Sequence, residues 1–255
     1  MLFRSAPKNT NLDIRLKNPA GSGSGLGASS AMLIACRIGI ASLVNHELDG
    51  ESLIRDTFQI ERLEMGIEGG FQDYYPAVYG GLNWIAQEPG TLNRKRARVE
   101  LKEKVRELID SKMVCLSLGI KRNGEEIIRD QTLRLVNRDA STRAALLSQL
   151  DLATEIKNSI ESDDVQGLLE MLEESYLLKK KYTPLMTNSV INCIESTLMD
   201  LGARGIKISG AGGGGHMFCF FPGGVPINLQ ERLPSHTSII DLRISEKGWH
   251  CIDGE

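Results

Sequence analysis

The chain has 255 residues, of which 41% are hydrophobic and 25% are charged, and its formal net charge is -3. This composition allows one large domain or two modest ones, and it argues against a nucleic-acid surface, which needs clustered Lys and Arg. No apolar run is long enough to cross a bilayer, and the five cysteines are scattered, as is typical of free thiols in a reducing cytoplasm. We therefore expect a cytoplasmic protein without nucleic-acid or membrane partners, and a homodimer is an open alternative to a monomer.

The first part of the chain alternates apolar segments with glycine-rich loops. In chain order, the apolar periodicity predicts a strand at Leu12–Leu16, helices at Ser30–Val44, Asp49–Met65 and Gln72–Tyr79, and a strand at Leu82–Ala86. The composition changes between residues 88 and 98, which makes this stretch the best boundary between two halves. Its basic run, Arg94–Arg98, is interpreted as a solvated face or loop.

The second part of the chain has longer helical patterns and ends in short strands. In chain order, the pattern predicts a strand at Met113–Leu118, helices at Ser141–Ser159, Asp163–Lys181 and Ser189–Gly202, strands at Arg204–Ser209 and His216–Phe221, a short helix at Asn228–Leu233 and a strand at Ile239–Ile244. Asp163 and Ser189 are suitable N-caps, and Gly202 is a suitable C-terminal stop.

A glycine- and serine-rich loop lies between the first predicted strand and the first predicted helix. Glycines allow positive φ and a close approach to a ligand, and the helix start offers unpaired N–H groups and the positive end of the helix dipole. This arrangement predicts a phosphate site at Gly23, Ser24, Gly25, Leu26, Gly27, Ala28, Ser29 and Ser30. No Lys follows the glycines, as a Walker loop requires, and their spacing does not fit a dinucleotide fingerprint. A flexible linker is the alternative interpretation.

Two acidic residues flank a second loop. Glu61 lies near the end of the second predicted helix, and Asp73 follows the loop. In phosphoryl transfer, one carboxylate can hold Mg²⁺ while another accepts the proton of the substrate hydroxyl. The alternative is that Glu61 pairs with Arg62 or another basic residue on a helix face, as most helical glutamates do.

A second glycine cluster joins two predicted strands, with five glycines in the turn Gly210–Gly215. Ordinary hairpins use only a few glycines, so this turn indicates that the backbone packs closely against a ligand or another loop. His216 starts the following strand and is interpreted as structural, because the sequence offers it no triad or metal cluster.

Three segments resemble motifs of the GHMP kinases and occur in the order of that family. Gly25-Leu-Gly-Ala-Ser-Ser-Ala31 is similar to the Gly-Leu-Gly-Ser-Ser-Ala motif, although Ala28 replaces a serine and the usual neighbouring proline lies upstream, as Pro19. Gly69-Gly-Phe-Gln-Asp-Tyr-Tyr75 is similar to a segment of the branch that contains heptose 7-phosphate kinases. Lys207-Ile-Ser-Gly-Ala-Gly-Gly-Gly-Gly215 resembles the third motif.

The resemblance implies ATP and Mg²⁺ as cofactors and assigns roles to individual residues. Asp73 matches the position of the catalytic base, Ser29 and Glu61 match the magnesium ligands, and the glycine loop holds the ATP phosphates. Contacts with the sugar are implied for Gly70, Gln72, Tyr75, Gly212 and Gly213.

The resemblance also implies an α+β fold in two domains. Residues 1–99 match an incomplete, S5-like N-terminal domain that binds ATP, and residues 100–255 match a ferredoxin-like C-terminal domain. The first motif of the family lies well upstream of the glycine loop, and only Arg4–Pro7 resembles it, faintly. We therefore expect that a segment is missing ahead of residue 1, and that the chain alone is poorly soluble or self-associates.

The implied activity is ATP-dependent phosphorylation of a sugar or sugar-phosphate hydroxyl, with D-glycero-D-manno-heptose 7-phosphate as the expected substrate. One alternative is a sugar 1-kinase similar to L-fucokinase or galactokinase. Another is a truncated, non-catalytic relative that binds nucleotide or sugar.

Overall fold

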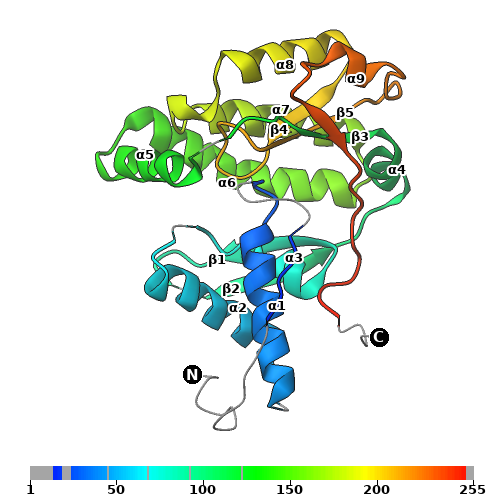
Figure 1. The fold of residues 1–255 in the computed structure, drawn as a ribbon. Coiled ribbons are helices and arrows are strands. Elements are labelled where there is room, and N and C mark those ends of the chain that lie inside the picture. Colours follow the sequence, from blue (N-terminus) through cyan, green and yellow to red (C-terminus); the bar gives the residue numbers. More distant parts are fainter. Residues whose placement is uncertain are drawn as a thin grey trace. The chain divides into compact units, whose positions relative to one another are not determined.

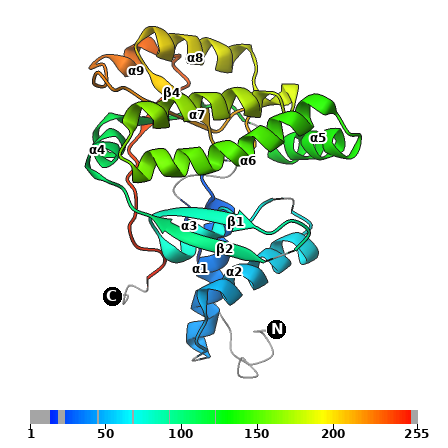
Figure 2. The ribbon, with the colours of Figure 1, turned by 180° about the vertical axis from the view of Figure 1, so that it is seen from behind.

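The computed structural model of the chain describes residues 14–18, 24–44, 46–67, 69–91, 93–121 and 123–250. They form two compact units (Figures 1 and 2). Unit 1 comprises residues 1–22, 27–96 and 245–255, and unit 2 comprises residues 23–26 and 97–244. Both units combine helices with antiparallel strands, so the predicted α+β class is confirmed. The domain boundary predicted after Val99 stays a prediction.

Unit 1 packs three helices around one small apolar core. Its elements are α1 (Ala28–Leu43), α2 (Gly50–Gln59) with a π-helical turn at Ile60–Glu64, α3 (Tyr74–Tyr79), and a ribbon of β1 (Leu82–Gln87) with β2 (Arg94–Val99), whose last residues belong to unit 2. The core is formed by Ile34 and Ile38 from α1, Leu53 and Ile54 from α2, and Tyr74, Tyr75 and Val78 from α3. Ile34 and Ile38 are four residues apart, so they share one face of α1.

The C-terminal segment returns to unit 1 and is bonded to it at two points. The Gly81 N–H donates to the Ser245 carbonyl at 2.7 Å, and the Trp249 N–H donates to the Ala77 carbonyl at 3.0 Å. A Cβ on Gly80 would lie 2.2 Å from a carbonyl carbon of this segment, so only glycine permits the approach. The segment Ser245–Trp249 is therefore a structural part of unit 1.

Unit 2 has a four-stranded antiparallel sheet in the order β4-β5-β3-β6. Its elements are α4 (Glu103–Lys112), β3 (Met113–Ser117), α5 (Gly124–Val136), α6 (Ala140–Glu161), α7 (Val165–Lys180), a 3₁₀ turn at Pro184–Met186, α8 (Ser189–Asp200), β4 (Arg204–Ile208), β5 (His216–Phe220), α9 (Leu229–Arg232) and β6 (Ser238–Ile240). Numbered one to four along the chain, these strands lie in the order 2-3-1-4, which is the ferredoxin-like order read from the other edge.

The main core of unit 2 lies between this sheet and α8. Ile191, Ile194 and Leu198 of α8 are fully buried against strand residues such as Leu116 and Met217. In Figures 1 and 2, α8 and α9 lie together on one side of the strands, while α6 and α7 run side by side as a helical hairpin. None of the helices in the described ranges has the length and hydropathy needed to span a membrane.

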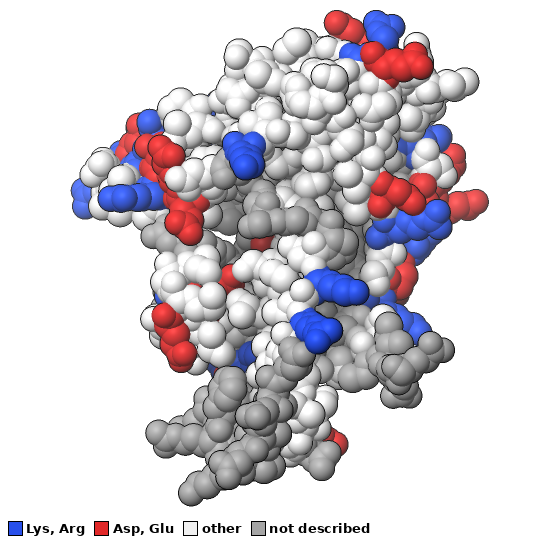
Figure 3. Space-filling view, viewed as in Figure 1, with Lys and Arg blue, Asp and Glu red and all other residues white. Residues whose placement is uncertain are grey.

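Figure 3 shows that the described surface carries charged side chains of both signs.

Two predicted helix caps are wrong by one residue. Asp164, not Asp163, accepts a hydrogen bond from the N-terminus of α7, and Asn188, not Ser189, does so for α8. Asp163 instead has a φ of 62° and accepts from the backbone N–H groups of Lys104 and Val105, at 3.2 and 2.9 Å. It therefore caps α4, a helix far away in the sequence.

Other elements also differ from the sequence prediction. Ile14 and Leu16 lie in no strand and are about half exposed, because alternating side chains do not by themselves supply a pairing partner; Leu12 lies outside the described residues. The basic run Arg94–Arg98 is strand β2 rather than a loop, and Lys95, Arg96 and Arg98 are exposed, in agreement with the predicted solvated face. The last strand ends at Ile240 rather than at Ile244. Helices α4 and α5 are absent from the prediction.

Candidate functional site

The N-terminus of α1 has no side-chain cap. Its N-cap, Gly27, has a φ of 72° and makes no side-chain hydrogen bond. Every other helix of ten or more residues in the described part of the chain has N-terminal N–H groups bonded to a side-chain oxygen: those oxygens come from Asp49, Asn123, Asp139, Asp163, Asp164 and Asn188. The first amides of α1 are thus left for another acceptor, and a phosphate group fits this role.

Glu61 meets this helix end through a hydrogen bond. It is only 7% exposed and lies in the π-helical turn after α2. The Ser29 hydroxyl donates to Glu61 Oε1 at 3.0 Å, and the Tyr74 hydroxyl donates to Oε2. Single π-helical turns occur frequently at functional sites, because they reorient a side chain within a helix. Here the turn holds a carboxylate beside the first turn of α1.

Asp73 lies against the same helix end. A Cβ on Gly27 would come within 3.3 Å of the Asp73 Cβ and 3.5 Å of its Cγ. Burial raises the pKa of the Asp73 carboxyl, and the nearby Glu61 carboxylate raises it further. Two reasons therefore favour glycine at position 27: its backbone has a positive φ, and Asp73 leaves little room for a Cβ.

The oxygen atoms gathered at this helix end suit a magnesium ion. Ser29 donates its hydrogen to Glu61 and keeps oxygen lone pairs free, and Glu61 adds a carboxylate. Mg²⁺ prefers such hard ligands, uses one or two protein carboxylates and completes its shell with water and phosphate oxygens. No group of three His, Cys, Asp or Glu side chains that could enclose a metal occurs among the residues described.

In unit 2, the second glycine turn is bonded to the first part of the glycine loop. The Ser209 hydroxyl donates to the Gly25 carbonyl at 2.5 Å, and His216 Nδ1 lies 2.8 Å from the Ser24 carbonyl. The interpretation of His216 as structural therefore agrees with its contacts. Leu26 donates its N–H to the Ser24 hydroxyl at 3.3 Å. Gly23 lies outside the described residues.

The predicted sugar contacts Gly212 and Gly213 are tightly packed by protein. A Cβ on Gly212 would lie 2.1 Å from the sulfur of Met186, and one on Gly213 would lie 2.6 Å from Ile127 Cδ1. The Gly213 N–H also donates to the Met186 carbonyl at 2.7 Å. Packing within unit 2 thus explains these two glycines without a ligand.

The sugar contacts predicted in unit 1 differ in accessibility. Gln72 is exposed, and its side chain folds over Gly70, whose Cβ would lie 2.1 Å from Gln72 Oε1. Tyr75 is fully buried in the core, and its hydroxyl donates to Glu51 at 3.2 Å. Gly70, Gln72 and Tyr75 therefore all stay predicted contacts, and Tyr75 is the one that the structure buries in the core.

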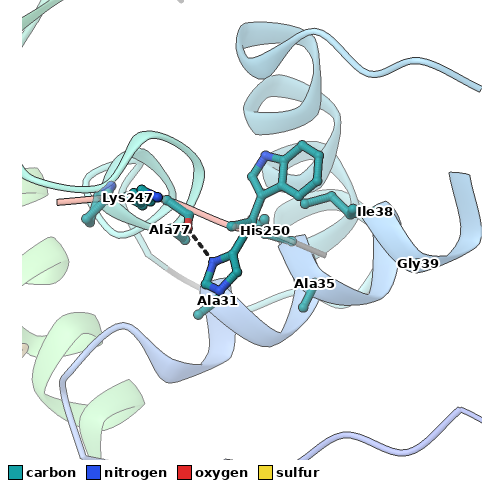
Figure 4. A pocket seen from close by; sticks show the side chains of 11 residues that line it. Ala31, Ala35, Ile38, Gly39, Ala77, Lys247 and His250 are labelled. Carbon is teal, nitrogen blue, oxygen red and sulfur yellow. Dashed lines mark hydrogen bonds between the residues drawn. The ribbon is translucent and has the colours of Figure 1, made fainter. Parts of the chain in front are cut away.

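A cavity in unit 1 is separate from these carboxylates. It measures about 500 Å³ and lies between α1 and the C-terminal segment (Figure 4). It is lined by Ala31, Ile34, Ala35, Ile38, Gly39, Pro76, Ala77, Lys247, Gly248, Trp249 and His250. None of the predicted site residues lines it.

Sequence reasoning missed Tyr74, the second partner of Glu61. Its only signal in the sequence is its position directly after Asp73, which does not distinguish it from Tyr75. Burial and the bond to Glu61 raise the pKa of the Tyr74 hydroxyl, so it stays protonated and acts as a donor.

Models of two domains of one family match the chain. The GHMP kinases N terminal domain matches residues 1–81, and the GHMP kinases C terminal domain matches residues 155–238. This chain belongs to the GHMP kinase family. The expectation drawn from the three motifs is thus confirmed at the level of family and fold.

Individual GHMP kinases resemble the chain over most of its length. A D-glycero-alpha-D-manno-heptose 7-phosphate kinase of Campylobacter jejuni is 28% identical over 231 residues, which are 89% of this chain and 66% of that protein. A bifunctional fucokinase/GDP-fucose pyrophosphorylase of Arabidopsis thaliana is 24% identical over 239 residues, 92% of this chain and 22% of that protein. A solved structure from Campylobacter jejuni has a TM-score of 0.68 at 25% identity, and it covers 89% of this chain and 64% of that one. The chain thus spans about two thirds of the Campylobacter relatives.

Proposed function

We propose that the chain is an ATP-dependent kinase that phosphorylates a hydroxyl of a sugar or sugar phosphate. The observation that carries this proposal is the convergence of two carboxylates on the uncapped end of α1. Glu61 reaches it through Ser29, and Asp73 lies against Gly27. Phosphoryl transfer needs an anion cradle, a cation site and a proton acceptor in one place, and these residues offer all three.

Each group has a distinct task in this proposal. The first amides of α1, at Ala28–Ser30, bind phosphate oxygens with the positive end of the helix dipole. Asp73 orients the attacking hydroxyl and accepts its proton, and its raised pKa makes it a stronger base than an exposed aspartate. Ser24, Gly25 and Leu26 of the glycine loop keep their predicted role as phosphate contacts.

Ser29 and Glu61 would hold Mg²⁺ in this site. When bound, the ion neutralises negative charge on the phosphate groups. The chain's own contribution is to fix the Glu61 carboxylate in place with two hydroxyl donors, Ser29 and Tyr74.

The substrate that we propose is D-glycero-D-manno-heptose 7-phosphate. The similarity to the Campylobacter kinase with that name, over 89% of this chain, supports it. The Arabidopsis fucokinase is similar at a lower identity, 24%, and supports L-fucose as the second candidate.

The test is ADP release from Mg-ATP with heptose 7-phosphate, L-fucose and galactose, with Asp73→Asn as the control. We expect turnover with the heptose phosphate. Turnover with only L-fucose or galactose would keep the kinase class and reject the heptose. A folded protein that shows no ATP binding by titration calorimetry would refute the kinase assignment. Nucleotide or sugar binding without turnover would favour the non-catalytic relative.

A further inference from the structure

A stack of aromatic and cationic side chains lies beside the segment that carries Asp73. The rings of Phe58 and Phe71 are stacked, with centroids 3.6 Å apart and planes inclined by 17°. The guanidinium carbon of Arg94 lies 3.2 Å from the Phe71 centroid, and that of Arg62 lies 5.5 Å from the Phe58 centroid. Such cation–π contacts hold a ring at a defined position.

The stack has contacts towards both carboxylates of the site. Phe71 precedes Asp73 by two residues, so fixing its ring restricts the backbone that places Asp73. Phe58 meets Tyr74 edge to face, with centroids 6.4 Å apart, and the Tyr74 hydroxyl donates to Glu61. Arg62 also donates to the Ile67 carbonyl at 3.2 Å, at the start of the same loop.

Arg94 stays on this ring although two of its nitrogens lack hydrogen bonds. Nε and Nη1 are buried without a hydrogen-bond partner among the residues that the structure describes. Buried donors that stay unpaired are unfavourable, and a solvent-exposed arginine would avoid them. The position of this guanidinium is therefore explained by its contact with the Phe71 face, together with an interaction with the Tyr75 hydroxyl.

We propose that Arg94 is a positioning residue, which holds the segment Phe71–Asp73 against Phe58 and thereby sets the position of Asp73 at the start of α1. The inference rests on the proposed kinase function for its catalytic consequence. The holding contact itself is a property of unit 1 that can be measured without turnover.

The chain offers a matched control two residues away. Arg96 lies on the same strand, and its guanidinium carbon is 3.9 Å from the centroid of the Tyr79 ring. The Tyr79 hydroxyl donates to Glu51, which is bonded to neither Glu61 nor Ser29 in the described residues. Arg96→Met therefore removes the same kind of stacked cation, together with one hydrogen bond to Asn83, at a position with no described contact to Asp73, Glu61 or Ser29.

The experiment compares Arg94→Met, Arg94→Lys and Arg96→Met in the full chain. Hydrogen exchange of a peptide containing residues 69–73 should rise in both Arg94 variants, because lysine keeps the charge but lacks the planar guanidinium. It should stay at the wild-type level in Arg96→Met. Equal exchange in Arg94→Met and wild type would overturn the inference. The exchange measurement does not require turnover, so it can be interpreted even if the wild-type chain phosphorylates no sugar. That second result would refute only the proposed function.

Turnover measurements test the catalytic consequence. We expect kcat of Arg94→Met to fall by about 10²-fold, as for a misplaced catalytic group, with KM for ATP within about twofold. A higher KM for the sugar phosphate at unchanged kcat would show that Arg94 binds substrate instead, and an equal loss in Arg96→Met would show a general effect on β2. Either result overturns the positioning role.

Discussion

The two carboxylates at the start of α1 have different surroundings. Glu61 has both oxygens bonded to hydroxyl groups, while Asp73 is partly buried, with Gly27 as its close neighbour. Environments that separate two acidic groups commonly assign them different roles in catalysis. In the proposed kinase, this difference is the reason for giving the cation to Glu61 and the proton to Asp73.

Asp73→Asn keeps the size of the side chain and removes its ability to take a proton. We expect turnover to fall by about 10²–10⁴-fold, while the affinity for ATP changes little. ADP release and titration calorimetry measure the two quantities. Near-normal turnover would remove the role of base from Asp73.

The same substitution should stabilise the folded chain at neutral pH. An aspartate whose pKa is raised on folding above its usual 3.8 binds its proton more tightly in the folded state. Stability therefore falls as the pH rises from about 3.8 through the raised pKa, and the loss is complete above it. The asparagine of the variant carries no such charge, so the melting temperature of Asp73→Asn should exceed that of the wild type at pH 7 and approach it near pH 3. A lower melting temperature at pH 7 would contradict this.

Glu61→Gln tests the cation site. The amide keeps a hydrogen-bonding oxygen for Ser29 or Tyr74 but loses the anionic ligand that Mg²⁺ prefers. We expect the magnesium concentration for half-maximal turnover to rise about tenfold or more, in line with the 10–100-fold losses of affinity for altered metal surroundings. A titration with MgCl₂ at fixed ATP measures it, and an unchanged midpoint would mean that Glu61 is only a helix-face residue.

At the scale of elements, α1 contains one glycine that its structure requires, Gly27 at its start, and one that it does not require, Gly39 in its interior. Gly27→Ala puts a Cβ at positive φ and within 3.3 Å of Asp73, so we expect weaker binding of Mg-ATP and a loss of stability on the order of 1 kcal/mol. Gly39→Ala is the control, since a Cβ there meets nothing within 4 Å. It should stabilise α1 by about 0.5–1 kcal/mol. Calorimetric titration with Mg-ATP and urea melts of both variants measure these effects. Equal changes in stability and in Mg-ATP affinity for the two variants would contradict the prediction.

Sequence patterns predicted elements where burial is regular. Helix α8 is an example: its buried residues Ile191, Ile194 and Leu198 have the three- and four-residue spacing of one apolar helix face. Helix α4 buries only Val105 and Leu108, and its remaining residues are mostly charged, so no periodicity reveals it. The basic strand β2 was also hidden, because Arg94 and Arg96 lie on aromatic rings that the local sequence does not identify.

Only the part of the site that lies in sequence motifs was predictable. The glycine loop and the carboxylates Glu61 and Asp73 were predicted from residue type and order. The structure brings both carboxylates to α1, and their roles stay predictions. Long-range packing decided the rest: Tyr75 went into the core, and Gly212 against Met186. Such contacts join residues that are distant in sequence, so residue spacing does not contain them.

At the scale of the whole molecule, unfolding can be followed separately in the two units. Both tryptophans of the chain, Trp84 and Trp249, belong to unit 1, whereas most long helices belong to unit 2. Unit 1 has the smaller described core. We expect the tryptophan fluorescence to change at a lower urea concentration than the helical circular dichroism signal.

A core variant of unit 2 supplies the control for this melt. Leu198 is fully buried against the sheet, and Leu198→Ala should cost about 2–5 kcal/mol. It should move the circular dichroism transition and leave the fluorescence transition in place. Coincident transitions in the wild type, moving together in Leu198→Ala, would show a single cooperative unit.

The return of the C-terminal segment to unit 1 also affects how the protein is made. Residues 27–96 leave the ribosome early, but Ser245 and Trp249, which bond to Gly81 and Ala77, are synthesised after all of unit 2. Most of unit 2 can therefore begin to fold before unit 1 receives this segment, in the usual domain-by-domain manner. Until then, the face of α1 that lines a cavity together with Trp249 is open to solvent, and transiently exposed apolar surface of this kind promotes aggregation.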